Sequence, residues 1–378
     1  MNTEIALNNI VNYFCDILEL PEGELPGRLD DHWDDVLKLA NDQNVYFYLA
    51  AWMLEHWDSD LTDSMKERFV RDLEWNKVRN RILQDEILQL ARIFRQADVK
   101  AMFLKGSAGI VRKLYPPQVR YLSDIDILIP DNDFRQVHQS LLENGYHTKK
   151  EVHIQNIKRH HSEPYYNQNS LGTIELHIDP YQQNYYSREQ LVQFWNNAEY
   201  IEYYVEKTLV PSIADHAWIQ IRTDLLARVC IPRIKDAIEL AVLLDYAEGS
   251  WLDEVIVKAT EHNVPNVAYG ALYAAQKYVN PEIPTVIGKW NGSFRQWEKW
   301  SNSYRKKHLL DDDQSYNKEK DFAAVRFYPA HTILSKMKFV LWLLRYNYRS
   351  YISYMLIEAH LYQIVRAVKH VVIPKKRV

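Results

Sequence analysis

The sequence predicts an α+β fold, in which a small mixed β-sheet is flanked by N- and C-terminal helical segments. Two patterns lead to this prediction. Apolar residues recur every three or four positions before residue 99 and again after residue 180, as on the buried face of a helix. Between these limits, short β-branched runs alternate with short helical stretches. The 378 residues are enough for roughly two or three domains, and the composition (47% hydrophobic, 25% charged) is typical of a folded protein.

Residues 1–98 are predicted to form an N-terminal helical domain. A first helix is expected from Thr3 to Leu20, where prolines follow, and a second around Trp33. A third, long helix is expected from about residue 62 to 96, because charged residues fill one of its faces and apolar residues recur on the other. Those apolar residues are Leu83, Ile87, Leu90 and Phe94.

Residues 99–180 are predicted to form the α/β core. Gly145 stands where glycine commonly ends a helix. The expected elements are a strand at 99–104, a helix at 107–115, a strand at 124–129, a helix at 131–144 and a strand at 173–178.

The chain after Pro180 is predicted to return to helix, in a C-terminal helical domain at 181–290. Ser187 is expected to cap the first of these helices. Further helices are expected at 214–228, 234–245, 253–262 and 267–279.

The last segment, 291–378, is basic and rich in aromatic residues. Between His331 and Val378 there are nine lysines and arginines and a single acidic residue, Glu358, although the whole chain has a net charge of −4. One interpretation is a helical hairpin that packs its aromatic residues on the body and leaves its cations solvated. The alternative is contact with RNA or with an anionic membrane surface.

Other features concern the cellular environment. The first residues lack the layout of a signal peptide, and no apolar run approaches the roughly 18 residues that span a bilayer. Cys15 and Cys230 are the only cysteines, too few for a disulfide framework. We therefore expect a soluble, cytoplasmic protein. The sequence contains no P-loop, dinucleotide-binding, zinc-protease or nucleophile-elbow motif.

Two carboxylates interrupt the apolar strand expected at 124–129. Asp124 and Asp126 point to the same face, because strand side chains alternate. A carboxylate pair on a buried strand is costly unless a cation compensates it. Glu175, between Ile174 and Leu176 on a later strand, is the candidate third acid. Three such acids predict a divalent metal site, with Glu175 also orienting or deprotonating an attacking hydroxyl.

A phosphate-binding turn is expected before these acids. Gly106 and Ser107 lie where a strand gives way to a helix, and free backbone N–H groups at such a junction favour phosphate. Lys105 or Arg120 would neutralise the charge of a leaving pyrophosphate.

A simpler interpretation is also open for the two aspartates and for the histidines. In it, Asp124 caps a turn after Ser123, and Asp126 pairs with a lysine across the sheet. The histidines His160, His161 and His177 are interpreted either as ligands of metal or phosphate, or as polar residues that line the same cleft for other reasons.

The combination resembles the polymerase-β-like nucleotidyltransferase superfamily, and more closely a branch of uncharacterised bacterial nucleotidyltransferases. The resemblance covers roughly residues 30–290. Asp124 lies 18 positions after Gly106 (124 − 106), which is longer than usual for the superfamily but suits the branch. The motifs that carry it are Phe103-Leu104-Lys105-Gly106, Leu114-Tyr115-Pro116, the run Arg120 to Leu128, His160-His161 and Ile174-Glu175-Leu176-His177.

The resemblance implies a polymerase-β-like core that uses Mg²⁺ or Mn²⁺. Asp124, Asp126 and Glu175 would occupy the catalytic metal positions, and Gly106 and Ser107 the phosphate positions. The expected activity transfers an NMP from an NTP donor to the hydroxyl of an unidentified acceptor (protein, small molecule or RNA) and releases pyrophosphate. The alternative is a non-catalytic nucleotide-sensing or RNA-binding protein that retains the fold.

Overall fold

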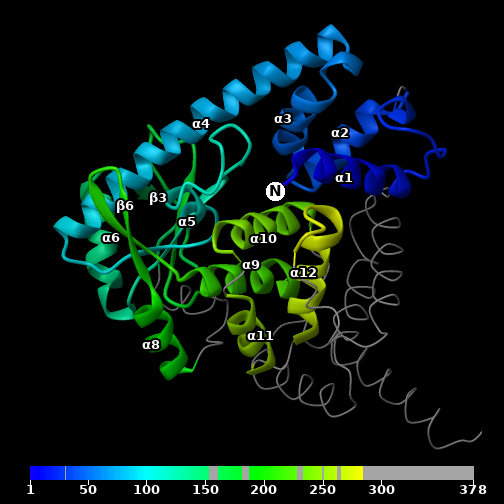
Figure 1. The fold of residues 1–378 in the computed structure, drawn as a ribbon. Helices are drawn as coiled ribbons and strands as arrows, with labels where there is room; N and C mark the ends of the chain where they lie inside the picture. Colours follow the sequence, from blue (N-terminus) through cyan, green and yellow to red (C-terminus); the bar gives the residue numbers. More distant parts are fainter. Residues whose placement is uncertain are drawn as a thin grey trace, which may run out of the picture.

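The computed structural model describes residues 1–29, 31–152, 161–180, 187–227, 233–248, 251–261 and 265–283 (Figure 1). Its α-helices are α1 (Thr3–Ile17), α2 (Trp33–Asp42), α3 (Tyr46–His56), α4 (Asp63–Gln96), α5 (Lys105–Val111), α6 (Phe134–Glu143), α8 (Arg188–Asn197), α9 (Ile213–Ala227), α10 (Ile234–Tyr246), α11 (Leu252–Glu261) and α12 (Pro265–Tyr278). Its strands are β1 (Met102–Phe103), β2 (Asp124–Leu128), β3 (His147–Thr148), β4 (Tyr165–Tyr166), β5 (Thr173–His177), β6 (Glu199–Tyr203) and β7 (Glu206–Val210).

The described strands form one seven-stranded mixed sheet in the order β3-β4-β5-β2-β1-β7-β6. The central pair β2–β5 is parallel and β1–β2 is antiparallel. β1 also pairs in parallel with β7, and the remaining pairs are antiparallel. A mixed sheet combined with many helices confirms the predicted α+β class.

Strands β6 and β7 were not predicted, because the sequence indicated only helix after Pro180. They form an antiparallel hairpin, and Leu209 of β7 pairs with Met102 of β1. Their stability comes from this pairing with a strand about a hundred residues earlier, which local sequence patterns do not reveal. The sheet therefore continues beyond residue 180, although the domain boundaries themselves stay a prediction.

Helix α3 also escaped the sequence analysis. Its residues are apolar around most of the helix, so no amphipathic period marks it. The first helix is shorter than predicted: it ends at Ile17, and Glu19 adopts a left-handed backbone conformation with φ 57°. The long helix α4 and the cap at Ser187 are as predicted.

Helix α4 connects the N-terminal helices to the sheet. Thr62 caps it by accepting a hydrogen bond from the Met65 N–H, and its 34 residues give a length of about 50 Å. Its first half packs against α3, and its second half packs against β7 and α6 (Figure 1).

The two faces of the sheet differ in chemistry, as the strand alternation predicts. On one face, Ile125 and Ile127 of β2 and Ile174 of β5 are fully buried in a core with α4 and α6. On the other face lie the acidic residues of β2 and β5. Next to them, Met102 and Leu209 pack against a core that includes α9.

The N- and C-terminal helices share that second core. Buried residues of α1, α3, α9, α10 and α12 form one continuous hydrophobic cluster. Tyr13 of α1 meets Tyr278 of α12 with ring centroids 4.9 Å apart. Within the described ranges, none of the helices combines the length and the apolarity needed to cross a membrane.

The buried histidine of α9 makes stability sensitive to acid. His216 is 2% exposed, and burial together with the charges of Arg112 and Arg120 lowers its pKa to about 3. Between pH ~6.5 and the folded pKa, only the unfolded chain takes up this proton. The contribution of His216 to stability is thus complete above pH ~6.5, and it is lost by about 1.4 kcal/mol per pH unit as the pH falls.

We expect His216→Gln to remove this part of the acid dependence. Urea unfolding of wild type and variant between pH 7 and 4.5 gives the slope of the free energy of unfolding against pH for each protein. His32→Gln, at a half-exposed histidine, is the control and should keep the wild-type slope. Equal slopes for all three proteins would contradict the assignment.

Candidate active site

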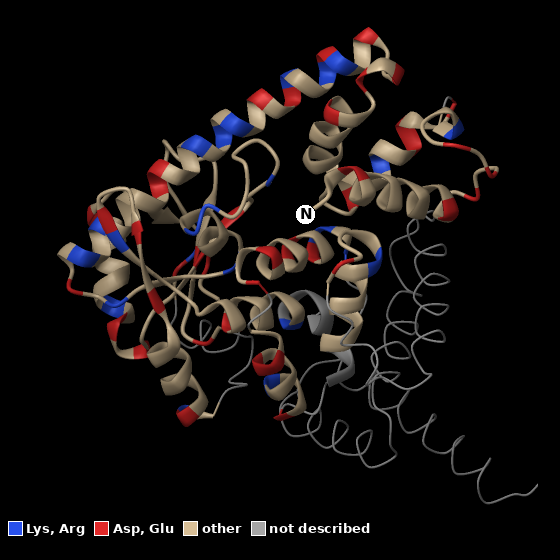
Figure 2. Ribbon diagram, viewed as in Figure 1, with Lys and Arg blue, Asp and Glu red and all other residues tan. Residues whose placement is uncertain are grey.

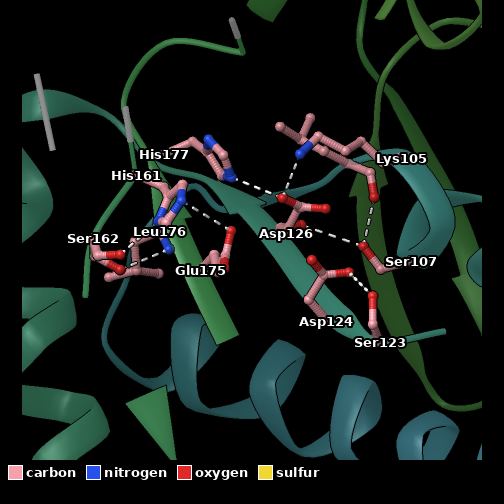
Figure 3. A network of polar contacts seen from close by, with 11 residues as sticks. Lys105, Ser107, Ser123, Asp124, Asp126, His161, Ser162, Glu175, Leu176 and His177 are labelled. Atoms are coloured by element: carbon pink, nitrogen blue, oxygen red, sulfur yellow. Dashed lines mark hydrogen bonds and ion pairs between the residues drawn. The ribbon is translucent and has the colours of Figure 1, made fainter. Parts of the chain in front are cut away.

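The register of β2 and β5 sets the geometry of the site. Asp126 pairs with Glu175, and Leu128 pairs with His177. Because the strands are parallel and side chains alternate, Asp126, Glu175 and His177 all leave the sheet on the same face. Figure 3 shows these side chains converging between β2 and β5.

Asp126 is the centre of the polar contacts. Its Oδ1 accepts hydrogen bonds from Lys105 Nζ at 2.6 Å and from His177 Nε2 at 2.8 Å, and the residue is only 3% exposed (Figure 3). Burial alone would raise the pKa of Asp126, but the Lys105 charge and the His177 hydrogen bond hold it well below its usual range. Asp126 therefore remains a carboxylate although it is buried.

Glu175 has a different electrostatic environment. Burial, followed by the charge of Asp126, raises the pKa of Glu175 to about 7, and the opposing charge of His161 limits the rise. His161 Nε2 lies 3.6 Å from Glu175 Oε2, and its Nδ1 hydrogen-bonds the Ser162 carbonyl. The negative charge of Asp126 disfavours the ionised form of Glu175. A cation bound between the two carboxylates would favour the ionised form of both.

The donor atoms of Asp126, Glu175 and His177 can meet at one point. One ligand atom from each lies within 4.8 Å of the other two. Two carboxylates and an imidazole are donors that suit Mg²⁺, Mn²⁺ or another divalent ion. The residues therefore fit the predicted metal site, with His177 in the position that the sequence analysis gave to Asp124.

Asp124 lies on the same face but outside this group of three. Its Oδ1 accepts a hydrogen bond from Ser123 Oγ at 2.9 Å, and it is half-buried at the start of β2. The contacts named in the simpler interpretation are thus present as well: Asp124 is bonded to Ser123, and Asp126 is paired with a lysine.

The turn after β1 brings Lys105 and Gly106 to the site. Lys105 has a left-handed backbone conformation, with φ 49°, which is uncommon for a residue with a side chain and often occurs at functional sites. A Cβ at Gly106 would lie 2.6 Å from Leu122 Cδ1 and 2.9 Å from Arg120 Nη2. Glycine is needed here because these side chains approach the backbone closely.

Ser107 and Arg120 are engaged in contacts of their own. The Ser107 hydroxyl is buried and lies 2.6 Å from the Leu104 carbonyl and 3.2 Å from that of Asp126. Arg120 is buried, and its Nε lies 2.6 Å from Glu239 Oε1 of α10. Their predicted roles in binding phosphate stay predictions. His160 lies outside the described residues, whereas His161 and His177 belong to the site.

The sequence analysis missed three polar residues of α4 that hold the loop before β2. Asn76 donates to the Gln118 carbonyl at 2.7 Å, Asn80 donates to the Pro117 carbonyl at 2.7 Å, and Arg79 donates to the Leu122 carbonyl. All three are buried. Their signal in the sequence is polar residues three and four positions apart on an otherwise apolar helix face.

The mixed sheet thus carries a carboxylate–imidazole cluster whose donor atoms fit a divalent metal, with a lysine beside it. The family model described as "Uncharacterised nucleotidyltransferase" matches residues 30–280, about two thirds of the chain. The protein belongs to this family, which confirms the resemblance seen in its motifs. No curated protein and no solved structure matches the chain.

We expect Gly106→Ala to destabilise the protein by about 1–3 kcal/mol, because the new methyl group would displace Leu122 or the Arg120–Glu239 pair. Urea unfolding measures the change. Gly27→Ala is the matched control, since a Cβ there has no neighbour within 4 Å and should change stability by less than about 0.5 kcal/mol. Equal stability of the two variants would show that the close approach at Gly106 is not a constraint.

Proposed function

We propose that the protein is a metal-dependent nucleotidyltransferase that moves an NMP from an NTP to an acceptor hydroxyl and releases pyrophosphate. The observation that carries the proposal is the convergence of Asp126, Glu175 and His177 beside Lys105 on one face of the sheet. Membership of a nucleotidyltransferase family supports the same chemistry.

In this proposal the catalytic core is polymerase-β-like and corresponds to residues 99–180, extended by β6 and β7. The segments 1–98 and 181–290 are its flanking helical domains. The basic segment 291–378, including the RNA or membrane contact predicted for 331–378, lies outside the described residues.

Asp126, Glu175 and His177 would hold the divalent ion, with Asp124 completing the acidic face. Mg²⁺ or Mn²⁺ bound there would supply positive charge to the triphosphate. Glu175 orients the acceptor hydroxyl and takes its proton. The hydroxyl oxygen bonds to the α-phosphorus, the bond from that phosphorus to the bridging oxygen breaks, and pyrophosphate leaves with the electron pair.

Lys105 and the backbone at Gly106 are assigned to the phosphates of the donor. Lys105 Nζ forms an ion pair with Asp126 Oδ1 at 2.6 Å, so its positive charge competes with any cation that binds this carboxylate. When the triphosphate enters, it offers Lys105 a second anionic partner. Ser107 and Arg120 lie next to this turn. Arg120 packs against Gly106 and pairs with Glu239 of α10.

A non-catalytic nucleotide sensor with this fold is the alternative function. It is less well supported, because a sensor gains nothing from several carboxylates held together at a cost in desolvation.

We expect Asp126→Asn and Glu175→Gln to abolish nucleotidyl transfer. Titration calorimetry of each NTP with Mg²⁺, followed by transfer assays with α-labelled nucleotide, gives the readout. Asp126→Asn also removes the partner of Lys105, so urea unfolding must establish that it folds. Glu175→Gln, at a less buried carboxylate, provides the second test.

Asp42→Asn, at an exposed residue ending α2, is the control and should behave as wild type. Transfer activity retained by folded Asp126→Asn would exclude the assigned role. NTP binding without transfer to any acceptor would favour the sensor.

We expect Lys105→Met to have opposite effects on the two ligands. Without nucleotide, Mn²⁺ should bind more tightly to the variant, since a competing positive charge is gone. The affinity for NTP should fall, since a phosphate partner is lost. Electron paramagnetic resonance measures Mn²⁺ binding and calorimetry measures NTP binding, with Lys105→Arg retaining the charge as the control. Weaker Mn²⁺ binding by Lys105→Met would contradict the arrangement.

A further inference from the structure

Three aromatic residues lie together near the acidic site: Phe47 of α3, Trp75 of α4 and Tyr121 of the loop before β2. Their ring centroids are 6.4 Å apart for Phe47–Trp75, 6.0 Å for Phe47–Tyr121 and 6.5 Å for Trp75–Tyr121. The corresponding angles between ring planes are 19°, 9° and 15°. We call this group the aromatic platform.

The three distances show that the platform is broad rather than a column. In a column of three rings, the outer two would be about twice as far apart as neighbours are. Here all three centroids are nearly equidistant and the planes are nearly parallel, so each ring packs against the other two with an offset. The two exposed members, Trp75 and Tyr121, leave aromatic surface open to planar groups.

Two of the three rings are exposed, whereas Phe47 is half-buried against the hydrophobic core. Trp75 is 55% exposed and Tyr121 is 36% exposed. The guanidinium of Arg79, a 5% exposed residue, lies 4.3 Å from the Tyr121 ring centroid and supports that ring from the protein side. Arg79 is in turn fixed by the Leu122 and Leu171 carbonyls. Exposed aromatic rings that buried residues hold in place often mark a binding site.

Two arginines lie beside the platform, each paired with acidic residues: both contact Asp72, and Arg68 also contacts Asp34. Arg71 and Arg68 precede Trp75 by four and seven positions, so all three share one side of α4. Their side chains are 72% and 43% exposed, and each contacts Asp72, at 3.2 and 3.8 Å. Asp72 also accepts a hydrogen bond from Tyr46 at 2.6 Å. Figure 2 shows Lys and Arg interspersed with Asp and Glu along α4. Surface pairs of this kind are weak and leave the arginines available to a stronger anion.

The platform is also close to the acidic site. Tyr121 is three residues before Asp124, so their Cα atoms are at most about 10 Å apart. Asn76 and Asn80 fix the loop that carries Tyr121. Arg79 interacts electrostatically with both Tyr121 and Asp124, which also places the platform next to the acidic site.

We propose that the aromatic platform, together with Arg68 and Arg71, binds the end of a single-stranded nucleic acid whose terminal hydroxyl is the acceptor. Bases stack on exposed rings, and phosphates bind arginines beside them, which is the pattern of single-strand recognition. The base of the donor NTP is a poorer match, since a single base needs neither three rings nor arginines seven positions away. The choice of acceptor rests on the proposed nucleotidyl transfer, but the binding itself does not.

The test measures binding of a fluorescently labelled ten-nucleotide RNA to the full-length protein by anisotropy, in EDTA and without NTP. Trp75→Ala and Tyr121→Ala should each weaken binding by about 5- to 100-fold, and Trp75→Phe by much less, because it keeps a ring. Arg71→Ala should reduce the slope of log affinity against log salt by about 0.7. Tyr200→Ala, at a 63% exposed tyrosine of β6, is the control and should bind as wild type.

Unchanged RNA affinity in both alanine variants would overturn the proposal, and so would a loss equal to that of Tyr200→Ala. Weaker NTP binding by Trp75→Ala with unchanged RNA binding would also overturn it and assign the platform to the donor base. Asp126→Asn separates the two proposals, because it should bind RNA normally and fail only in transfer. RNA binding through the platform in a wild-type protein without transfer activity would refute the nucleotidyl transfer alone.

Discussion

The arrangement of the site depends on keeping one buried carboxylate charged. Asp126 is nearly inaccessible to water, and an isolated charge there would be prohibitively costly. Lys105 and His177 compensate it through the same oxygen. Each of these contacts depends on a strand pairing. Lys105 reaches Asp126 because β1 pairs with β2, and His177 reaches it because β5 runs parallel to β2. The sheet topology and the electrostatics of the site are therefore one constraint.

The helices maintain this constraint from two sides. On the α4 side, side-chain amides bind the carbonyls of the loop that leads into β2. On the α10 side, Glu239 pairs with Arg120, which lies against Gly106. A buried ion pair adds little net stability but costs much when one partner is removed, so it favours a single arrangement of the turn. The turn that carries Lys105 is thus fixed by contacts distant in sequence.

Sequence patterns predicted what local chemistry determines. β2, β5, α4 and the cap at Ser187 follow from alternation, helical period and hydrogen-bonding side chains close in the chain. The hairpin of β6 and β7 depends on pairing with a distant strand, which has no local pattern. The acids were expected on one face and lie there, but the sequence could not tell that His177, rather than Asp124, joins Asp126 and Glu175 in the group of three. The register places Asp124 and His177 two positions to either side of the Asp126–Glu175 pair. The side-chain contacts make the difference, because His177 hydrogen-bonds Asp126 whereas Asp124 accepts from Ser123.

The shared helical core includes residues that precede the part of the chain matched by the family model. Helix α1 precedes residue 30, where the family match starts, yet Leu7, Ile10, Val11 and Phe14 are fully buried in the cluster with α3 and α12. Burying each such side chain contributes about 1.5–3 kcal/mol, and their sum is comparable with the ~5–15 kcal/mol stability of a typical domain. The helical layer of the matched segment is therefore completed by residues that precede it in the chain, and we expect the segment to be less stable without them.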